Sequence, residues 1–129
     1  MTLSEVEALY ETTDHFLSLS GQAARVIAEN RRILRPHWQM FHERRDALIK
    51  KYADETGAVK QGAPNWKDFI ADMNDLLSWE IDVNIKKLPA DTTMDAFDFP
   101  GATVKDLDLA MEYFVDAEEK KNTDADTEK

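Results

Sequence analysis

The clearest pattern along the chain is a seven-residue repeat of apolar positions in its first half. Two neighbouring columns recur at this interval: Ile27, Leu34, Phe41 and Leu48 in one, and Val26, Ile33, Met40 and Ala47 in the other. Seven residues make about two turns of α-helix, so both columns lie on one side and form a wide apolar face. A face of this width is typical of a helix that packs against several neighbours. The repeat therefore predicts a long helix over about residues 22–52 within a helical bundle.

A proline interrupts this predicted helix. Pro36 removes one backbone hydrogen bond and crowds the preceding turn. We expect a kink between Arg32 and His37, or a split into two helices.

The other helices are predicted from capping signals. In each, a Ser, Thr or Asn precedes an acidic residue by three positions, which lets the side chains bind free N–H groups of the first turn. The pairs are Ser4 with Glu7, Asn65 with Asp68, and Thr103 with Asp106. The predicted helices cover about residues 4–19, 65–79 and 103–115. Gly21 is placed to close the first of them.

One segment has the alternation of a β-strand. In residues 80–85, Ile81, Val83 and Ile85 alternate with Asp82 and Asn84, which indicates a half-buried strand. A lone strand needs a partner. Three candidates are residues 58–60, residues 97–99 and the same strand in a second copy of the chain, and we expect a small hairpin or sheet patch.

These patterns together predict a mainly α fold, a bundle of three to four helices with a long kinked second helix and a small β-hairpin or strand element. The apolar fraction of 43% in 129 residues is enough for one hydrophobic core. We expect a helical domain over residues 1–115. Residues 116–129 contain no apolar side chain larger than alanine, which predicts a disordered acidic tail.

Several function classes are disfavoured by what the sequence lacks. It has no cysteine, no apolar run of membrane-spanning length and no signal-peptide pattern at its first residues, so we expect a cytoplasmic protein. His15, His37 and His42 do not have metal-site spacing, and no Gly-rich phosphate loop or nucleophile elbow occurs. We therefore predict that the protein is not an enzyme and binds no metal or cofactor.

The charge distribution singles out the long helix. The net charge is −10, yet residues 21–52 carry eight bases and three acids. One interpretation is that these bases neutralise acidic neighbours inside the bundle. The other is an arginine-lined surface for an acidic or phosphate-bearing partner. Direct nucleic-acid binding is not expected of a chain with this overall charge.

Large aromatic residues and the predicted strand over residues 80–85 are further candidates for contacts with a partner. Trp66 is expected to be exposed, whereas Trp38 and Trp79 are expected in the core. An unpaired strand edge favours partner capture or self-association. The candidate partner-binding residues are Arg31, Arg35, Arg44, Arg45, Trp66, Ile81, Val83 and Ile85.

Four segments also carry a resemblance. They are residues 23–34 (AARVIAENRRIL), 44–52 (RRDALIKKY), 74–85 (NDLLSWEIDVNI) and 104–113. Their order resembles a loosely defined family of small, largely uncharacterised proteins of tailed bacteriophages and prophages, some described as tail components or assembly chaperones. The resemblance spans most of residues 5–115 and brings no defined site residues. Pro36 and the acidic tail depart from it.

The expected function is therefore that of a non-enzymatic accessory binding protein in phage virion or tail assembly. Its partner would be a phage structural protein, and homo-oligomerisation through the strand is a further expectation. The alternative is an acidic inhibitor that mimics nucleic acid and occupies a basic groove on a host defence or nucleic-acid enzyme.

Overall fold

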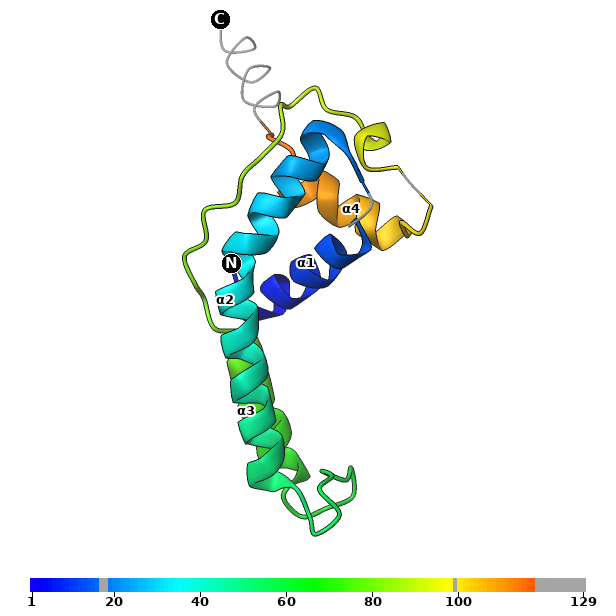
Figure 1. Cartoon of the computed structure of the whole chain (residues 1–129). Coiled ribbons are helices and arrows are strands. Elements are labelled where there is room, and N and C mark those ends of the chain that lie inside the picture. Colours follow the sequence, from blue (N-terminus) through cyan, green and yellow to red (C-terminus); the bar gives the residue numbers. More distant parts are fainter. Residues whose placement is uncertain (17–18, 99, 118–129) are drawn as a thin grey trace, which may run out of the picture. The chain divides into compact units, whose positions relative to one another are not determined.

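The computed structural model describes residues 1–16, 19–98 and 100–117. Its elements are α1 (Leu3–His15), α2 (Gly21–Tyr52), α3 (Trp66–Leu77), the short 3₁₀ helix η1 (Met94–Phe97) and α4 (Val104–Tyr113), shown in Figure 1. The predicted mainly helical fold with a long second helix is confirmed. The predicted tail falls almost entirely on residues 118–129, outside the described residues.

The chain divides into two compact units. Unit 1 consists of Met1–Ala8 and Leu34–Val83, and unit 2 of Leu9–Ile33 and Asn84–Lys129. Helices α1 and α2 each contribute one part to each unit. The two units are therefore described separately.

Helix α2 continues without interruption through Pro36. Of the two expected outcomes, the split into two helices is wrong, and the kink stays a prediction. Proline deprives the carbonyl of Arg32 of its helical partner, but Arg32 and Pro36 are both exposed, so water can bind that carbonyl. The predicted helix bounds of 22–52 differ from the observed ones by one residue.

Helix α1 begins at Leu3, one residue earlier than predicted. The backbone N–H of Thr2 donates to Oε1 of Glu5 (2.8 Å), and the N–H of Glu5 donates to Oγ1 of Thr2 (3.2 Å). This is the capping-box arrangement, and the prediction that Ser4 and Glu7 form it is wrong. The earlier register also brings Leu3 into the core, where it is fully buried.

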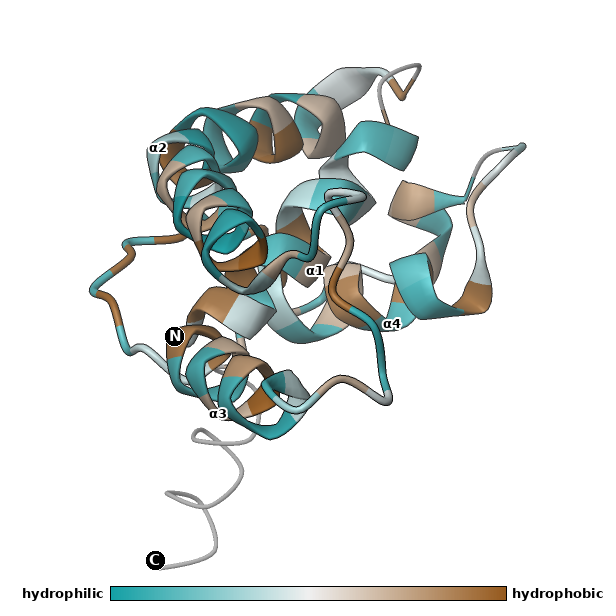
Figure 2. Ribbon diagram, turned by 90° about the horizontal axis from the view of Figure 1, so that it is seen from below, coloured by the Kyte–Doolittle hydropathy of each residue, from teal (hydrophilic) through white to brown (hydrophobic). Residues whose placement is uncertain are grey.

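Unit 1 is built around apolar side chains from three helices. The buried ones are Leu3 and Val6 of α1, Leu34 and Phe41 of α2, and Phe69 and Leu76 of α3. In Figure 2 hydrophobic and hydrophilic residues alternate along α2 and α3, as amphipathic helices require. Asn65 precedes α3 but does not cap it with its side chain, contrary to prediction. Its Nδ2 instead donates to the carbonyl of Tyr52 at the end of α2 (3.0 Å).

The predicted β-hairpin is absent from the described residues. Glu80 instead forms an isolated antiparallel bridge with Thr2. The N–H of Leu3 donates to the carbonyl of Trp79 (3.0 Å), and the N–H of Ile81 donates to that of Met1 (2.8 Å). The N-terminal residues thus take the place expected for residues 58–60 or 97–99. Pairing with a second copy stays a prediction.

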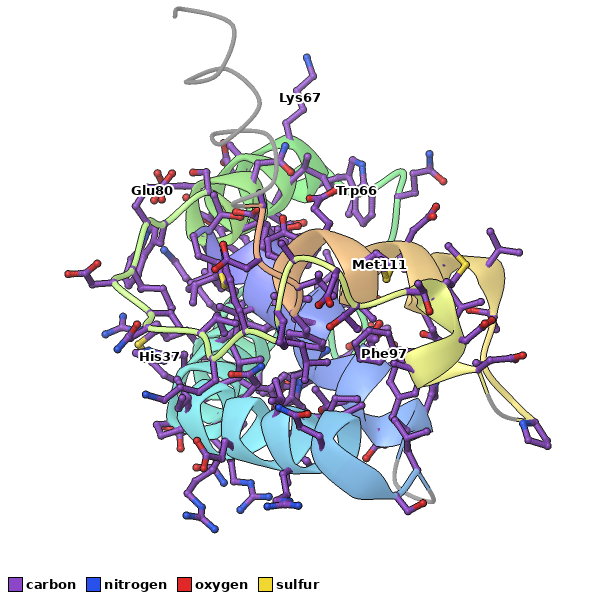
Figure 3. All side chains as sticks on the ribbon, turned by 90° about the horizontal axis from the view of Figure 1, so that it is seen from above. His37, Trp66, Lys67, Glu80, Phe97 and Met111 are labelled. Atoms are coloured by element: carbon purple, nitrogen blue, oxygen red, sulfur yellow. The ribbon has the colours of Figure 1, made fainter. Side chains whose placement is uncertain are left out.

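In unit 2, the buried side chain of Asn30 fixes the backbone at Lys86. Asn30 of α2 is fully buried, and its Nδ2 donates to the carbonyl of Lys86 (2.9 Å) while its Oδ1 accepts from the N–H of Lys86 (2.7 Å). Two residues later, the N–H of Leu88 donates to the carbonyl of Phe114 (2.7 Å). Phe97, labelled in Figure 3, is buried with its ring centre 5.9 Å from that of Phe16.

Candidate functional site

A groove lies between the second half of α2 and α3, within unit 1. Its cavity volume is about 250 Å³, enough for one large side chain. The lining residues are Arg44, Ala47 and Leu48 of α2, Asp72, Asp75 and Leu76 of α3, and Trp79 just beyond α3. The lining combines an apolar floor with charged groups from both helices, which suits an apolar side chain flanked by polar ones.

Arg44 and Trp79 both line this groove and contact each other. The guanidinium carbon of Arg44 lies 4.8 Å from the centre of the Trp79 ring, a cation–π contact. The prediction that Trp79 lies in the core is wrong, because it follows the last turn of α3 and is 37% exposed. Its Nε1 donates weakly to Asp75 (3.4 Å). Arg44 has no carboxylate partner among the described residues, so its donors are available to a ligand.

The carboxylate of Asp72 is fixed at the same groove. Asp72 accepts a hydrogen bond from the hydroxyl of Tyr52 (2.5 Å) and lies 3.8 Å from Nζ of Lys51. The hydrogen bond to Asp72 raises the pKa of Tyr52 to about 12. Tyr52 therefore remains a donor at neutral pH, and it joins the end of α2 to α3.

A second cavity, of about 380 Å³, lies in the loop between α2 and α3. Asp54 accepts hydrogen bonds from the side chain and backbone of Thr56 and lies 3.3 Å from Nζ of Lys60. These contacts, the Thr56 hydroxyl first, lower the pKa of Asp54 to about 2. The charged groups of this cavity thus satisfy one another, which makes it a weaker candidate than the groove.

The predicted arginines are divided between the two units. Arg31 belongs to unit 2, where it contacts Asp14 (2.9 Å), Oγ1 of Thr13 (3.0 Å) and the Tyr10 ring (4.5 Å). It neutralises α1, as the first interpretation of the basic helix proposed. Of these arginines only Arg44, in unit 1, lines the groove.

The remaining predicted residues are less accessible or more dispersed. Arg35 is exposed, while Arg45 is half-buried beside Asp46 (3.3 Å) and its buried Nε has no hydrogen-bond partner among the described residues. Trp66 is half-buried, with its ring centre 5.7 Å from that of Phe69, so the expectation of an exposed ring is met only in part. The side chains of Ile81, Val83 and Ile85 are half-buried.

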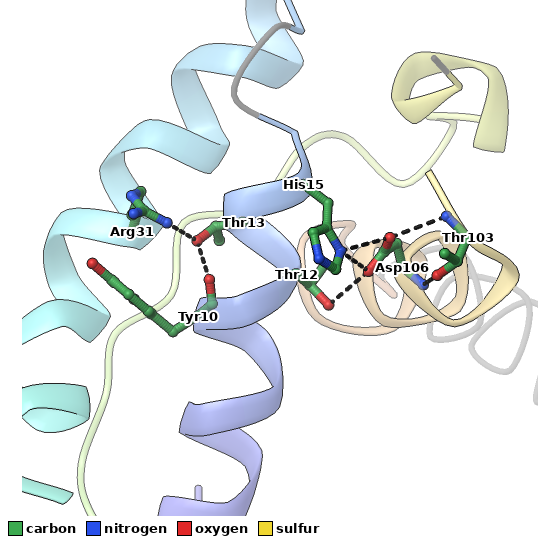
Figure 4. A network of polar contacts seen from close by, with 7 residues as sticks. All are labelled: Tyr10, Thr12, Thr13, His15, Arg31, Thr103 and Asp106. Atoms are coloured by element: carbon green, nitrogen blue, oxygen red, sulfur yellow. Dashed lines mark hydrogen bonds and ion pairs between the residues drawn. The ribbon is translucent and has the colours of Figure 1, made fainter. Parts of the chain in front are cut away.

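Unit 2 contains a polar network that was not predicted from the sequence (Figure 4). Nδ1 of His15 lies 2.9 Å from both carboxylate oxygens of Asp106, and the hydroxyl of Thr12 donates to Oδ1 (3.2 Å). Asp106 and Thr103 also form the predicted capping box of α4. Burial alone would raise the pKa of Asp106, but hydrogen bonds from the Thr103 backbone and from His15 outweigh it and lower the pKa.

The network joins α1 to α4 within unit 2. An ionised Asp106 only accepts hydrogen bonds, so Nδ1 of His15 is the donor and Nε2 is left unprotonated at neutral charge. Such a pair resembles the base of a hydrolase, but neither cavity described above includes it. In the described part of the chain, no group of three or more His, Asp or Glu side chains is arranged to hold a metal ion.

Comparisons with known proteins add no assignment. No family model, no curated protein and no solved structure matches this chain. Among the described helices, none has the length and apolar character needed to cross a membrane.

Proposed function

We propose that this protein is a non-enzymatic binding protein that holds a partner protein in the groove between α2 and α3. The observation that carries the proposal is the Arg44–Trp79 pair that lines the groove. Tryptophan and arginine are the residues most enriched at the energetic centres of protein interfaces. Here the exposed indole and the guanidinium, which has no carboxylate partner among the described residues, line the groove together with Leu48 and Leu76.

The groove suits a helix of the partner with one inserted apolar side chain. Packing between Arg44 and Trp79 holds both groups in place before binding, which lowers the entropy lost on association. A carboxylate on the partner would bind the donors of Arg44, and a basic group would pair with Asp75, which also lines the groove. Removing either member of the pair should therefore weaken binding.

We place this activity in the assembly of a phage virion or tail, as an accessory function. This part of the proposal rests on the resemblance to small phage and prophage proteins in residues 23–34, 44–52, 74–85 and 104–113. The competing function is an acidic inhibitor of a host defence or nucleic-acid enzyme. The two differ in the identity of the protein that occupies the groove.

Affinity capture with matched variants tests the proposal. The tagged full chain would be expressed in cells producing the phage, alongside Arg44→Glu, Trp79→Ala and Lys67→Glu. Lys67 gives the same charge change as Arg44 but points away from α3 into solvent (Figure 3) and does not line the groove.

The parent and Lys67→Glu should retain a phage structural protein, identified by mass spectrometry, which Arg44→Glu and Trp79→Ala lose. Equal recovery of that protein by all four chains would refute the groove. Recovery of a host nucleic-acid enzyme instead would favour the inhibitor. Thermal melting of each variant shows whether a loss of binding comes from unfolding.

A further inference from the structure

One side of helix α4 in unit 2 is exposed to solvent. Val104, Asp108 and Glu112 are spaced by four residues, so they lie along one side of the helix, and all three are exposed. Val104 is 78% exposed, although a β-branched apolar residue gains nothing from this position by helix propensity. The side thus starts with an apolar residue and continues with two carboxylates.

The 3₁₀ helix η1 adds a second exposed apolar residue. It packs against α4, with Phe97 fully buried and Met94 45% exposed. Asp95, the next residue after Met94, is also exposed. The two packed elements therefore present an apolar residue each, accompanied by acids.

The charge around these elements is almost entirely negative. Residues 89–117 contain seven acids and a single base, Lys105. Of these seven acids, Asp106 is bound to the imidazole of His15. The other six acids are exposed and have no ion-pair partner among the described residues: Asp91, Asp95, Asp98, Asp108, Glu112 and Asp116. Unpaired like charges repel one another, and a basic ligand relieves that repulsion.

We propose that the exposed side of α4 together with η1 docks a basic, amphipathic segment of a partner protein. Lysines or arginines of the segment would pair with Asp108, Glu112 and Asp95, while apolar residues of the segment would cover Val104 and Met94. Nucleic acid is repelled by this charge, and a purely charged ligand leaves both apolar side chains in water. This docking surface shares no residue with the groove of unit 1, so each can fail independently of the other.

Fluorescence anisotropy with two labelled peptides tests the proposal on the full chain. One is an amphipathic helix of lysine and leucine, and the other has the same length and charge with serine in place of leucine. The leucine peptide should bind about tenfold more tightly, because it alone covers the apolar residues. Equal affinity of the two peptides overturns the proposal, because charge alone would then explain binding.

Paired variants locate the binding. Asp108→Asn with Glu112→Gln should weaken the leucine peptide by about tenfold, and Val104→Ser with Met94→Ser by a similar factor. The matched control, Asp68→Asn with Asp82→Asn, removes the same charge from exposed acids of unit 1 and should change affinity by less than about twofold. An equal loss in the control pair, or no loss in the α4 pair, overturns the proposal.

Discussion

The imidazole of His15 is bound through Nδ1 to both carboxylate oxygens of Asp106, each at 2.9 Å, across 91 residues of sequence. Asp106 is almost fully buried, and the same carboxylate accepts from the N–H of Thr103 (3.0 Å) at the start of α4. One ionised side chain thus caps α4 and fastens it to α1. The stability of unit 2 should therefore depend on the charge of Asp106.

The first prediction concerns acid stability. The pKa of Asp106 is lower in the folded chain than in the unfolded chain, so its contribution is present above the ordinary carboxyl range of about 4 and is lost as the pH falls below it. Asp106→Asn should lower the free energy of unfolding by about 1–3 kcal/mol at pH 7. Chemical denaturation from pH 7 to pH 2 should show this difference shrinking, whereas a difference independent of pH would contradict the assignment.

The second prediction concerns Tyr52. Its pKa is raised from 10.0 to about 12 by the hydrogen bond to Asp72, so the stability that this bond provides is present below pH 10 and is lost as the pH rises through 12. Ultraviolet titration should show a tyrosine that ionises near pH 12. Asp72→Asn should move this titration back towards 10. An unchanged curve in the variant would mean that the bond does not form.

The third prediction concerns the core of unit 1. Phe41 is 1% exposed, so Phe41→Ala should lower the free energy of unfolding by about 3–5 kcal/mol. Leu48→Ala should cost less, because Leu48 is half-buried at the groove. Thermal melting of the two variants checks that Phe41→Ala is the more destabilising. A melting curve of Phe41→Ala that matched the parent would refute the packing of α2.

The fourth prediction concerns Asn30. Asn30→Ala leaves the backbone N–H and carbonyl of Lys86 without their partners and should destabilise the protein by about 1–3 kcal/mol. Hydrogen exchange at the Lys86 amide should quicken in this variant but not in Asn84→Ala, where the side chain is exposed. Unchanged protection of Lys86 in Asn30→Ala would show that another group holds the segment.

The sequence predicted those features that depend on nearby residues. The heptad columns of α2 repeat over three intervals, and its bounds were placed within one residue. Leu34 and Phe41 are buried as expected, whereas Leu48, expected in the core with them, is half-buried. The box of Thr103 and Asp106 was also identified correctly. At the first helix, however, Thr2 with Glu5 competes with Ser4 and Glu7 at the same spacing. Only tertiary packing of Leu3 separates the two.

Features that depend on distant residues were missed. The hairpin was expected because the alternation in residues 80–85 shows that a pairing partner is needed but not which segment provides it. Thr2 pairs with Glu80, and the side chain of Asn30 binds the backbone of Lys86. Trp79 was expected in the core from its size alone, and its exposure follows from where α3 ends. The arginines were treated as one group, yet Arg31 and Arg44 belong to different units.

The most direct test of partner docking is photo-cross-linking from inside the groove. A benzophenone amino acid would replace Ala47, which is exposed and lines the groove, and in a second chain would replace the exposed Lys67 outside it. After irradiation in cells producing the phage, position 47 should give a covalent adduct with one defined protein, and the same protein should be absent from the position 67 sample. Adducts of equal yield at both positions, or none at position 47, would contradict the groove as the binding site.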